Sequence, residues 1–315
     1  MEYQHIPVML NEVLAGLNPQ PGQVFVDCTL GGAGYTLALA KLVGPKGKII
    51  SIDLDDLALE NAKSKIKLAD VSNVVLFQDN FRNLQNIIDE NFPADFKVDG
   101  VVMDLGLSSA QLDDDSRGFS FQGDRPLDMA FNQEGHTAIA TTTIVNRYSL
   151  ERLTSVFREY GEEPKAYLVA KKIVEKRKKN WIRTTGELLT IVSEVLKPNP
   201  RSRINPATKI FQALRMETNK ELDALREVLP AAANLLKSGG RLAVVSFHSG
   251  EDKIVKEFLK FESKDCICSS SVPVCVCHHK ASLEILTKKP SPASDAESNL
   301  NPRARSAKLR LAQKI

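Results

Sequence analysis

The chain has 315 residues, 43% apolar and 26% charged, which is the balance of a globular protein of about two domains. This composition excludes a chain that is disordered throughout, a collagen and a coiled rod. A net charge of +3 is too close to neutral to indicate a nucleic-acid partner by itself. No run of about 18 apolar residues could span a bilayer, and the first residues lack a signal-peptide pattern. We therefore expect a cytoplasmic protein with no membrane partner.

The first third of the chain alternates strand-like apolar runs with amphipathic stretches. Asp56, after the second run, can cap a helix whose apolar residues recur at helical spacing. Strand and helix repeated in this order predict an α/β fold, a doubly wound parallel sheet with helices on both faces. The four predicted strands are Val24–Asp27, Lys48–Asp53, Val74–Phe77 and Gly100–Asp104.

After Asp104 the alternation stops for about a hundred residues, and the pattern becomes helical. A long helix at about 216–236 then leads to a fifth strand, Arg241–Phe247, with Gly239 and Gly240 expected to form the turn after the helix. We therefore predict a helical domain at 113–212 inserted into a sheet domain formed by 1–112 and 213–315. Its expected helices are Leu150–Val169, Ala170–Lys179 and Gly186–Leu196.

Two more strand-like segments lie near the end of the chain, Ser282–Thr287 and Ser306–Leu311. Strands joined by so short a connection should pair antiparallel. The segment between them, 289–302, is rich in Pro, Ser and Asn and is predicted to be a flexible loop.

A glycine-rich loop follows the first strand, and its residues are Gly31, Gly32, Ala33 and Gly34. Glycines let a ligand approach the backbone closely. Asp53 ends the next strand 19 residues after Gly34, where its carboxylate can bind both ribose hydroxyls of an adenosine. A simple tight turn is the alternative. A nicotinamide dinucleotide is disfavoured because Leu37 replaces the third glycine, so S-adenosylmethionine is the better candidate cofactor.

Three carboxylates end neighbouring strands: Asp27, Asp53 and Asp104. In doubly wound sheets ligands bind beyond the carboxyl ends of the strands, so these side chains should face one crevice. Phe81 follows the third strand and could lie against an adenine ring. His248 ends the fifth strand, which favours a substrate or proton-accepting role over a purely structural one. Phe247 could stack a flipped base or belong to the core.

Two basic groups are candidates for nucleic-acid binding, although charge runs are often only solvated surfaces. One belongs to the predicted inserted domain and comprises Lys171, Lys172, Lys176, Arg177, Lys178, Lys179 and Arg183; the other comprises Arg303, Arg305, Lys308 and Arg310. In the second group, an Arg-x-Arg pair can grip phosphates bidentately.

Four of the five cysteines, Cys266, Cys268, Cys275 and Cys277, cluster within twelve residues. In a reducing compartment they suggest a metal site or plain packing before disulfides. They could supply four tetrahedral ligands to zinc, although Cys-x-Cys is less typical than Cys-x-x-Cys. We assign no metal to the catalytic site.

Several motifs resemble the bacterial 16S rRNA cytosine-N(4)-methyltransferase family, also called small-subunit rRNA methyltransferase H or MraW. The resemblance runs nearly end to end and is highly specific. It is carried by 5–10 (HIPVML), the loop at 27–34, 104–121 (DLGLSSAQLDDDSRGFSF), 126–129 (PLDM), 207–222 (ATKIFQALRMETNKEL), 245–249 (VSFHS) followed by Glu251 and Asp252, and 301–309 (NPRARSAKL).

The resemblance implies a class I methyltransferase domain, a Rossmann-like sheet with an antiparallel C-terminal strand, plus an inserted helical domain. It also implies methylation of the 4-amino group of a cytidine in the decoding region, with 16S rRNA or the small ribosomal subunit as partner. Asp104 and His248 are the implied catalytic candidates. The implied cofactor positions are Ala33, Gly34, Tyr35, Asp53, Phe81, Asp104 and Gln111; Gly31 and Gly32 come from the loop itself.

Four positions depart from the family pattern: Tyr35, Ala130, Asn205 and Gly250, where the family usually has His, Arg, His and Leu. None of them removes Asp53, Asp104 or Gln111. The rival interpretations are a non-catalytic ribosome-assembly or RNA-binding factor that retains the fold, and a dehydrogenase. The sequence leaves the oligomeric state open.

Overall fold

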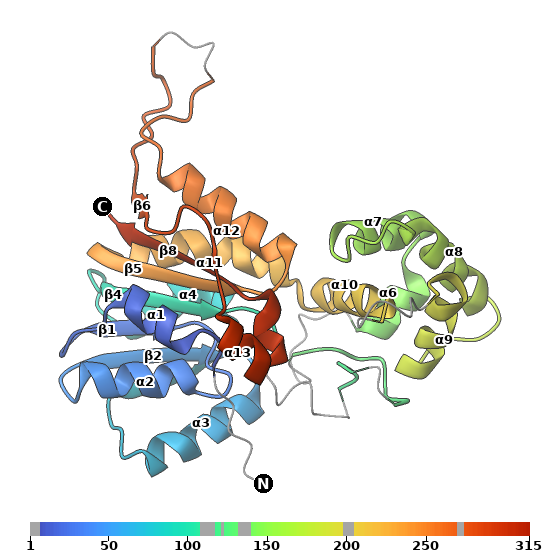
Figure 1. Cartoon of the computed structure of the whole chain (residues 1–315), viewed down its shortest axis with the longest axis horizontal. Helices are drawn as coiled ribbons and strands as arrows, with labels where there is room; N and C mark the ends of the chain where they lie inside the picture. The colour runs from blue at the N-terminus through green and yellow to red at the C-terminus, as the bar shows by residue number, and fades with distance from the viewer. Residues whose placement is uncertain (1–6, 108–116, 121–122, 132–139, 198–204, 270–273) are drawn as a thin grey trace. The chain divides into compact units, whose positions relative to one another are not determined.

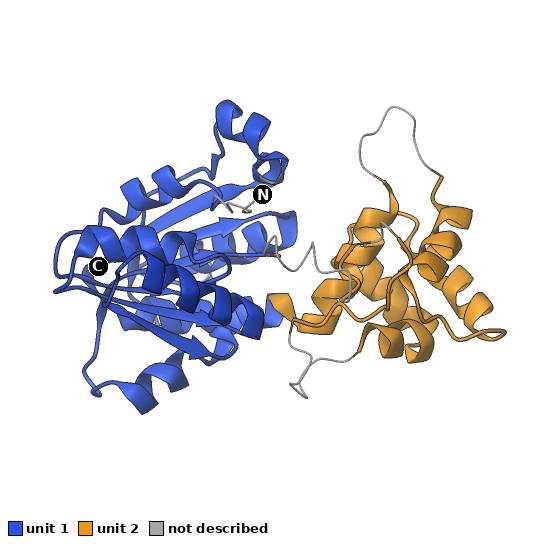
Figure 2. Ribbon diagram, turned by 90° about the horizontal axis from the view of Figure 1, so that it is seen from below, with its two compact units in different colours: residues 1–106, 222–315 blue, residues 107–221 orange. Residues whose placement is uncertain are grey.

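The computed structural model of the chain describes residues 7–315 except 108–116, 121–122, 132–139, 198–204 and 270–273 (Figure 1). The chain forms two compact units. Unit 1 contains residues 1–106 and 222–315, and unit 2 contains residues 107–221 (Figure 2). Among the described residues, no helix combines the length and the apolar character that a membrane crossing requires.

Unit 1 is built on one mixed sheet with the strand order β3-β2-β1-β4-β5-β8-β6, and β7 pairs with β8 outside this path. The strands β3, β2, β1, β4 and β5 pair in parallel, whereas β8 is antiparallel to β5, β6 and β7. The predicted α/β class with an antiparallel C-terminal strand is confirmed. The strands are β1 (Val24–Asp27), β2 (Lys48–Asp53), β3 (Val74–Gln78), β4 (Val98–Asp104), β5 (Leu236–Ser246), β6 (Leu283–Ile285), β7 (Ser291–Pro292) and β8 (Lys308–Lys314).

Helices cover both faces of the sheet, because each strand of the parallel part carries a run of mostly apolar residues on both of its faces. One buried cluster joins the sheet to α4, α11 and α12, and another joins it to α1 and α2. The helical elements of this part are α1 (Leu10–Leu17), α2 (Gly34–Val43), α3 (Asp56–Leu68), η1 (Phe81–Asn83), α4 (Leu84–Asn91), α11 (Glu221–Leu235), α12 (Ser249–Glu262), α13 (Asp295–Leu300) and η2 (Pro302–Ser306).

Three local predictions in unit 1 were wrong. The helix α3 is capped by Asp55, which accepts the Leu57 N–H at 3.1 Å, and not by Asp56. Gly239 has a φ of +80° and lies within β5, where the register to β4 shifts, so this glycine forms a bulge and not a helix-ending turn. The segment 289–302 contains β7 and α13, and α13 is capped by Ser294, so the predicted flexible loop is a folded segment.

Unit 2 is helical and has its own core, made of apolar side chains from all five of its described helices. Its helices are α6 (Thr141–Arg147), α7 (Leu150–Glu159), α8 (Ala166–Arg177), α9 (Thr185–Val195) and α10 (Ala207–Asn219). The predicted helix Leu150–Val169 is in fact divided between α7 and α8. Gly161, a left-handed Glu162 (φ +45°) and Pro164 interrupt it.

The predicted helix at about 216–236 is also two helices. The helix α10 ends at Asn219, and α11 begins at Glu221. Lys220 between them has a φ of +52°, which a continuous helix does not allow. Arg215 and Glu221 form a bidentate ion pair across the break, with N–O distances of 2.7 and 2.8 Å.

Candidate functional site

The loop between β1 and α2 is held in a strained backbone conformation. Gly31 has a φ of +44° and Ala33, the residue before α2, has a φ of +64°. The carbonyl of Gly32 accepts the Lys65 ammonium at 2.9 Å, and Gly34 lies against Pro7, where a Cβ would come within 2.4 Å of the proline ring. A left-handed non-glycine residue is costly, and such residues cluster at ligand-binding sites. The loop is therefore positioned from both sides before a ligand arrives.

Asp53 ends β2 and contacts this loop directly. Its Oδ2 accepts the Gly31 N–H at 2.8 Å, and its Oδ1 accepts the Asp55 N–H at 2.9 Å. Burial raises the pKa of Asp53 to about 6 in spite of these two bonds. Each carboxylate oxygen can accept a second hydrogen bond, so the group can still receive two hydroxyl donors.

Asp27 ends β1 and supports the loop from beneath. Its side chain is fully buried and accepts the Thr29 N–H at 3.1 Å and the Thr36 hydroxyl at 2.7 Å. The Thr36 Oγ1 also lies 2.8 Å from the Ser51 Oγ. Burial raises the pKa of Asp27. These bonds connect the end of β1 to the start of α2, so Asp27 orders this part of the loop. That its side chain faces a ligand stays a prediction.

Asp104 ends β4, and its surroundings differ from those of the other two carboxylates. Its N–H donates to the Thr29 hydroxyl at 2.7 Å, which fixes the end of β4 against the residue that follows β1. Its Oδ1 is buried with no hydrogen-bond partner among the residues that the structure describes. Burial, and then the carboxylates of Asp27, Glu251 and Glu297, raise the pKa of Asp104 well above its usual range. A buried oxygen of this kind is costly unless a ligand pairs with it.

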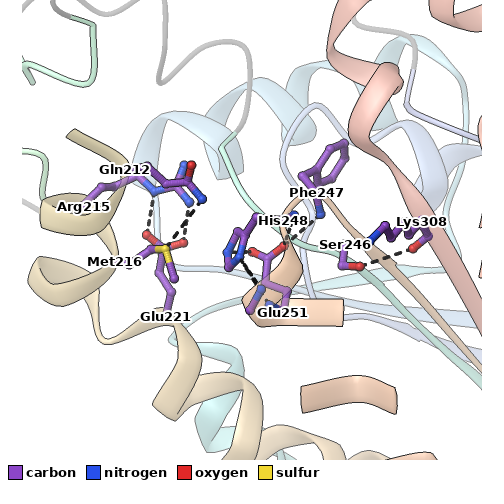
Figure 3. Close-up of polar contacts among 10 residues, drawn as sticks. Gln212, Arg215, Met216, Glu221, Ser246, Phe247, His248, Glu251 and Lys308 are labelled. Carbon is purple, nitrogen blue, oxygen red and sulfur yellow. Dashed lines mark hydrogen bonds and ion pairs between the residues drawn. The ribbon is translucent and has the colours of Figure 1, made fainter. Parts of the chain in front are cut away.

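His248 follows β5 and caps α12, as Figure 3 shows together with its contacts to Glu251. Its Nδ1 accepts the N–H groups of Gly250 and Glu251 at 3.2 and 3.3 Å. Its Nε2 lies 2.9 Å from Glu251 Oε1, which is an ion-pair distance, but the two groups lack hydrogen-bond alignment. The other Glu251 oxygen accepts the Phe247 N–H at 2.9 Å. Phe247 packs, half-buried, against the core of the α1 and α2 face.

The two aromatic candidates for the cofactor site have different environments. The hydroxyl of Tyr35 donates to the Val8 carbonyl, and the side chain is buried. Burial raises the pKa of this phenol above its usual value. Phe81 begins η1 after β3 and is half-buried against the core that contains α4. The predicted cofactor residue Gln111 lies outside the described residues, as does the side chain of Arg303.

Some of the basic residues predicted to bind RNA make contacts within the protein, and others are exposed. Glu194 binds the ammonium groups of Lys172 and Lys176 at 2.7 and 2.6 Å. Arg177 donates to the carbonyls of Val145 and Tyr148 at 2.8 and 2.6 Å, so it ties α8 to the end of α6.

By contrast, Lys171 and Lys178 are exposed, and neither forms an ion pair with another residue in the described part of the chain. Arg305 is exposed and donates from Nε to the Ser298 carbonyl at 3.3 Å. Lys179 and Arg183 are exposed as well. Of the predicted set, these four residues and Arg305 therefore present the most accessible charge.

Sequence reasoning gave no role to a buried acid in unit 2. Glu217 is fully buried, and its Oε1 contacts Arg152, Lys220 and Tyr148 at 2.8–2.9 Å. These three partners come from α7, the loop before it and the end of α10. No local sequence signal distinguishes Glu217 from an exposed helix residue, because two of its partners lie more than 60 residues away in the chain.

Comparison with known proteins places the whole chain in one group. The family described as the MraW methylase family matches residues 2–315. A protein of Clostridium botulinum (strain Loch Maree / Type A3) named ribosomal RNA small subunit methyltransferase H is 44% identical over 315 residues, which cover 100% of both chains. Proteins of the same name from Finegoldia magna and Dehalococcoides mccartyi are 42% and 44% identical over 100% of this chain and 100% and 87% of their own lengths.

Proposed function

Because the chain belongs to the MraW methylase family, we propose that it transfers a methyl group from S-adenosylmethionine to the 4-amino group of a cytidine in the decoding region of 16S rRNA. The structural observation that carries this proposal is the buried Oδ1 of Asp104 at the end of β4, which has no hydrogen-bond partner among the described residues. The full-length match to relatives named for the small ribosomal subunit supports the choice of rRNA as substrate.

The residues around the β1–α2 loop fit S-adenosylmethionine. Asp53 keeps acceptor capacity for the two ribose hydroxyls, and the backbone of the loop at 31–34 is already ordered by Asp53 and Lys65. Tyr35 contributes through its backbone, because its hydroxyl is engaged within the protein. Phe81 would contact the adenine, and Gln111 completes the proposed set.

Asp104 is the proposed catalytic residue. When bound, the cofactor supplies an electrophilic methyl group and a positive charge. The exocyclic amine of cytosine is conjugated with its ring, so it is a poor nucleophile and needs a hydrogen-bond acceptor. The Asp104 Oδ1 can accept from this amine. Its raised pKa makes this carboxylate a stronger base than an exposed aspartate, which suits it to hold the proton that the amine loses.

For His248 the contacts favour a positioning role over proton acceptance. The Nδ1 lone pair already receives two backbone N–H groups, and Nε2 faces Glu251. Neither nitrogen therefore offers a lone pair to a substrate proton. The ring holds the start of α12, and Glu251 holds the backbone of Phe247 just after β5, the strand that pairs with the end of β4 at Asp104.

RNA recognition is proposed for the inserted helical domain, which we place at 113–212 with the remainder of the chain as the methyltransferase domain. Lys171 and Lys178 are among its accessible charges, and Lys172 and Arg177 are held in place by their intrachain contacts. Arg303 and Arg305 form the proposed contribution of the other domain. The partner would be 16S rRNA or the small subunit, which places the enzyme in the cytoplasm.

The rival function is a ribosome-assembly factor that has kept the fold without the reaction. Deleting the gene in the source bacterium and mapping 16S rRNA by mass spectrometry separates the two. We expect one cytidine to lose its N4-methyl group and to regain it when the gene is restored. An unchanged methylation pattern, together with no cofactor binding by calorimetry, would favour the assembly factor.

Asp104→Asn tests the proposed chemistry. The substitution keeps the shape of the side chain and removes the charge next to the reacting amine. Electrostatic groups of this kind are worth about 2.7–4 kcal/mol, so single-turnover methylation at saturating cofactor should slow at least about a hundredfold. A near-normal rate in a variant with an unchanged melting temperature would remove Asp104 from the catalytic role.

A further inference from the structure

We propose that Cys266, Cys268, Cys275 and Cys277 bind one zinc ion that cross-links the segment joining α12 to β6. This segment, 263–282, leaves the end of α12 and returns to the sheet at β6 (Figure 1). The four sulfur atoms all lie within 4.8 Å of one another. No part of the methyltransferase reaction requires this metal.

The distances between the sulfur atoms match a tetrahedral thiolate site. A zinc–sulfur bond of about 2.3 Å in a tetrahedron places the sulfurs about 3.8 Å apart. Cys275 lies 3.5 Å from Cys266 and 3.6 Å from Cys277, and Cys277 lies 3.8 Å from Cys266. A disulfide would need about 2.05 Å, so none of these contacts is a disulfide. The spacing therefore leaves room for a metal at the centre of the four.

The backbone around the cysteines is arranged as it is around metal-bound sulfur. Three N–H groups donate to cysteine sulfurs at 3.4 Å: Ile267 to Cys277, Cys268 to Cys266, and Val276 to Cys268. Two of these hydrogen bonds connect the two Cys-x-Cys pairs, and the third lies within the first pair. Hydrogen bonds of this kind orient metal ligands and stabilise negative charge on them.

The described part of this segment lacks a buried core of its own. None of its described residues is buried, and Val274 and Val276 are 71% and 67% exposed. Its two arms therefore cannot be ordered by an apolar core. A structural zinc site contributes folding free energy of its own, which replaces the missing core.

The choice of zinc and of a structural role follows from the ligands. Four sulfur donors in a tetrahedron select zinc or iron–sulfur chemistry, and a site with four protein ligands leaves no open position for a substrate. The segment begins at the end of α12. The other end of this helix, which His248 caps, is about 20 Å away along the helix axis. We therefore assign the ion to the fold of this segment and not to methyl transfer.

The test is the metal content of the full chain, expressed without a metal-chelating tag in zinc-supplemented medium and purified with a thiol reductant. Plasma mass spectrometry should find about one zinc per chain. Cys266→Ser with Cys275→Ser should lower this to less than about a tenth. The matched control is Cys28→Ala, since Cys28 is the one cysteine outside the cluster and is buried in β-sheet surroundings. It should keep its zinc.

A second measurement on the unmodified chain does not depend on whether the variant folds. Trypsin should cut after Lys264 and Lys280, which flank the cysteines, faster once a zinc chelator is added, while cleavage elsewhere stays unchanged. The proposal is overturned if the wild-type chain holds iron instead of zinc. It is also overturned if the chain holds no metal and its four thiols react freely with a thiol reagent in the presence of zinc, or if mass spectrometry finds them paired in disulfides.

Discussion

The pH dependence of cofactor binding should reveal Asp53. Burial raises its pKa to about 6, and the ribose hydroxyls should be bound by the ionised form. At pH 5 about nine in ten carboxyls would be protonated in the free protein, so S-adenosylmethionine affinity should be about tenfold lower than at pH 8, or about 1.4 kcal/mol. Isothermal titration calorimetry at constant ionic strength measures this. Asp53→Asn should bind more weakly at pH 8 and lack this part of the pH dependence.

The same carboxyl should affect stability with the opposite trend. Its folded-state pKa lies above the ordinary value of 3.8. Its contribution to the free energy of unfolding is therefore fully present below about pH 4 and is lost as the pH rises through 6. The two-unit difference corresponds to a loss of at most about 3 kcal/mol in the ligand-free protein. Subtracting the Asp53→Asn curve removes the effects of Asp27 and Asp104. Parallel curves for wild type and variant, in binding and in stability, would refute the reasoning.

Three further experiments test the other assignments. His248→Asn keeps a good helix cap, so this variant should retain methylation if the ring only positions α12. His248→Ala should lower the free energy of unfolding by about 1 kcal/mol. Loss of the reaction in a folded Asn variant would restore a chemical role for the imidazole. Reversing the charges of Lys171 and Lys178 should weaken RNA binding and flatten its salt dependence, while cofactor affinity stays constant. If the salt dependence does not change, the two lysines are only solvated surface residues. Arg177→Met should lower the free energy of unfolding, measured by urea titration, by about 1.5–3 kcal/mol. The control Lys178→Met should change it by less than about 0.5 kcal/mol. Equal losses in the two variants would contradict the role of Arg177 in connecting α8 to α6.

The parallel strands and the Asp53 position could be predicted because their signals are local. Each strand contains an apolar run and ends at a polar residue, and Asp53 ends β2 19 residues after Gly34. The same local reasoning failed for the segment 289–302, whose polar composition suggested a loop. Glu297 in this segment accepts the Met9 N–H at 2.7 Å, a contact between residues 288 positions apart. Composition carries no information about such a partner.

The helix break at Lys220 and the helix-capping role of His248 were missed for different reasons. Lys220 adopts a left-handed conformation without being glycine or asparagine, so its residue type gave no sign of the break. His248 did have a usable signal, because Glu251 stands three residues later, which is the spacing of a capping box. That spacing would have favoured a helix start over a free imidazole at the strand end.

The position of the helical unit within the chain bears on the order of folding. The strands β4 and β5 are neighbours in the sheet, yet about 130 residues separate Asp104 from Leu236. Closing a flexible loop of that length costs about 2 kcal/mol more than closing one of about 15 residues, since the entropy cost grows with the logarithm of length. If unit 2 first folds around its own core, its chain ends are brought together and much of that cost disappears. We therefore expect hydrogen exchange during refolding to protect α7 and α8 before β5 pairs with β4.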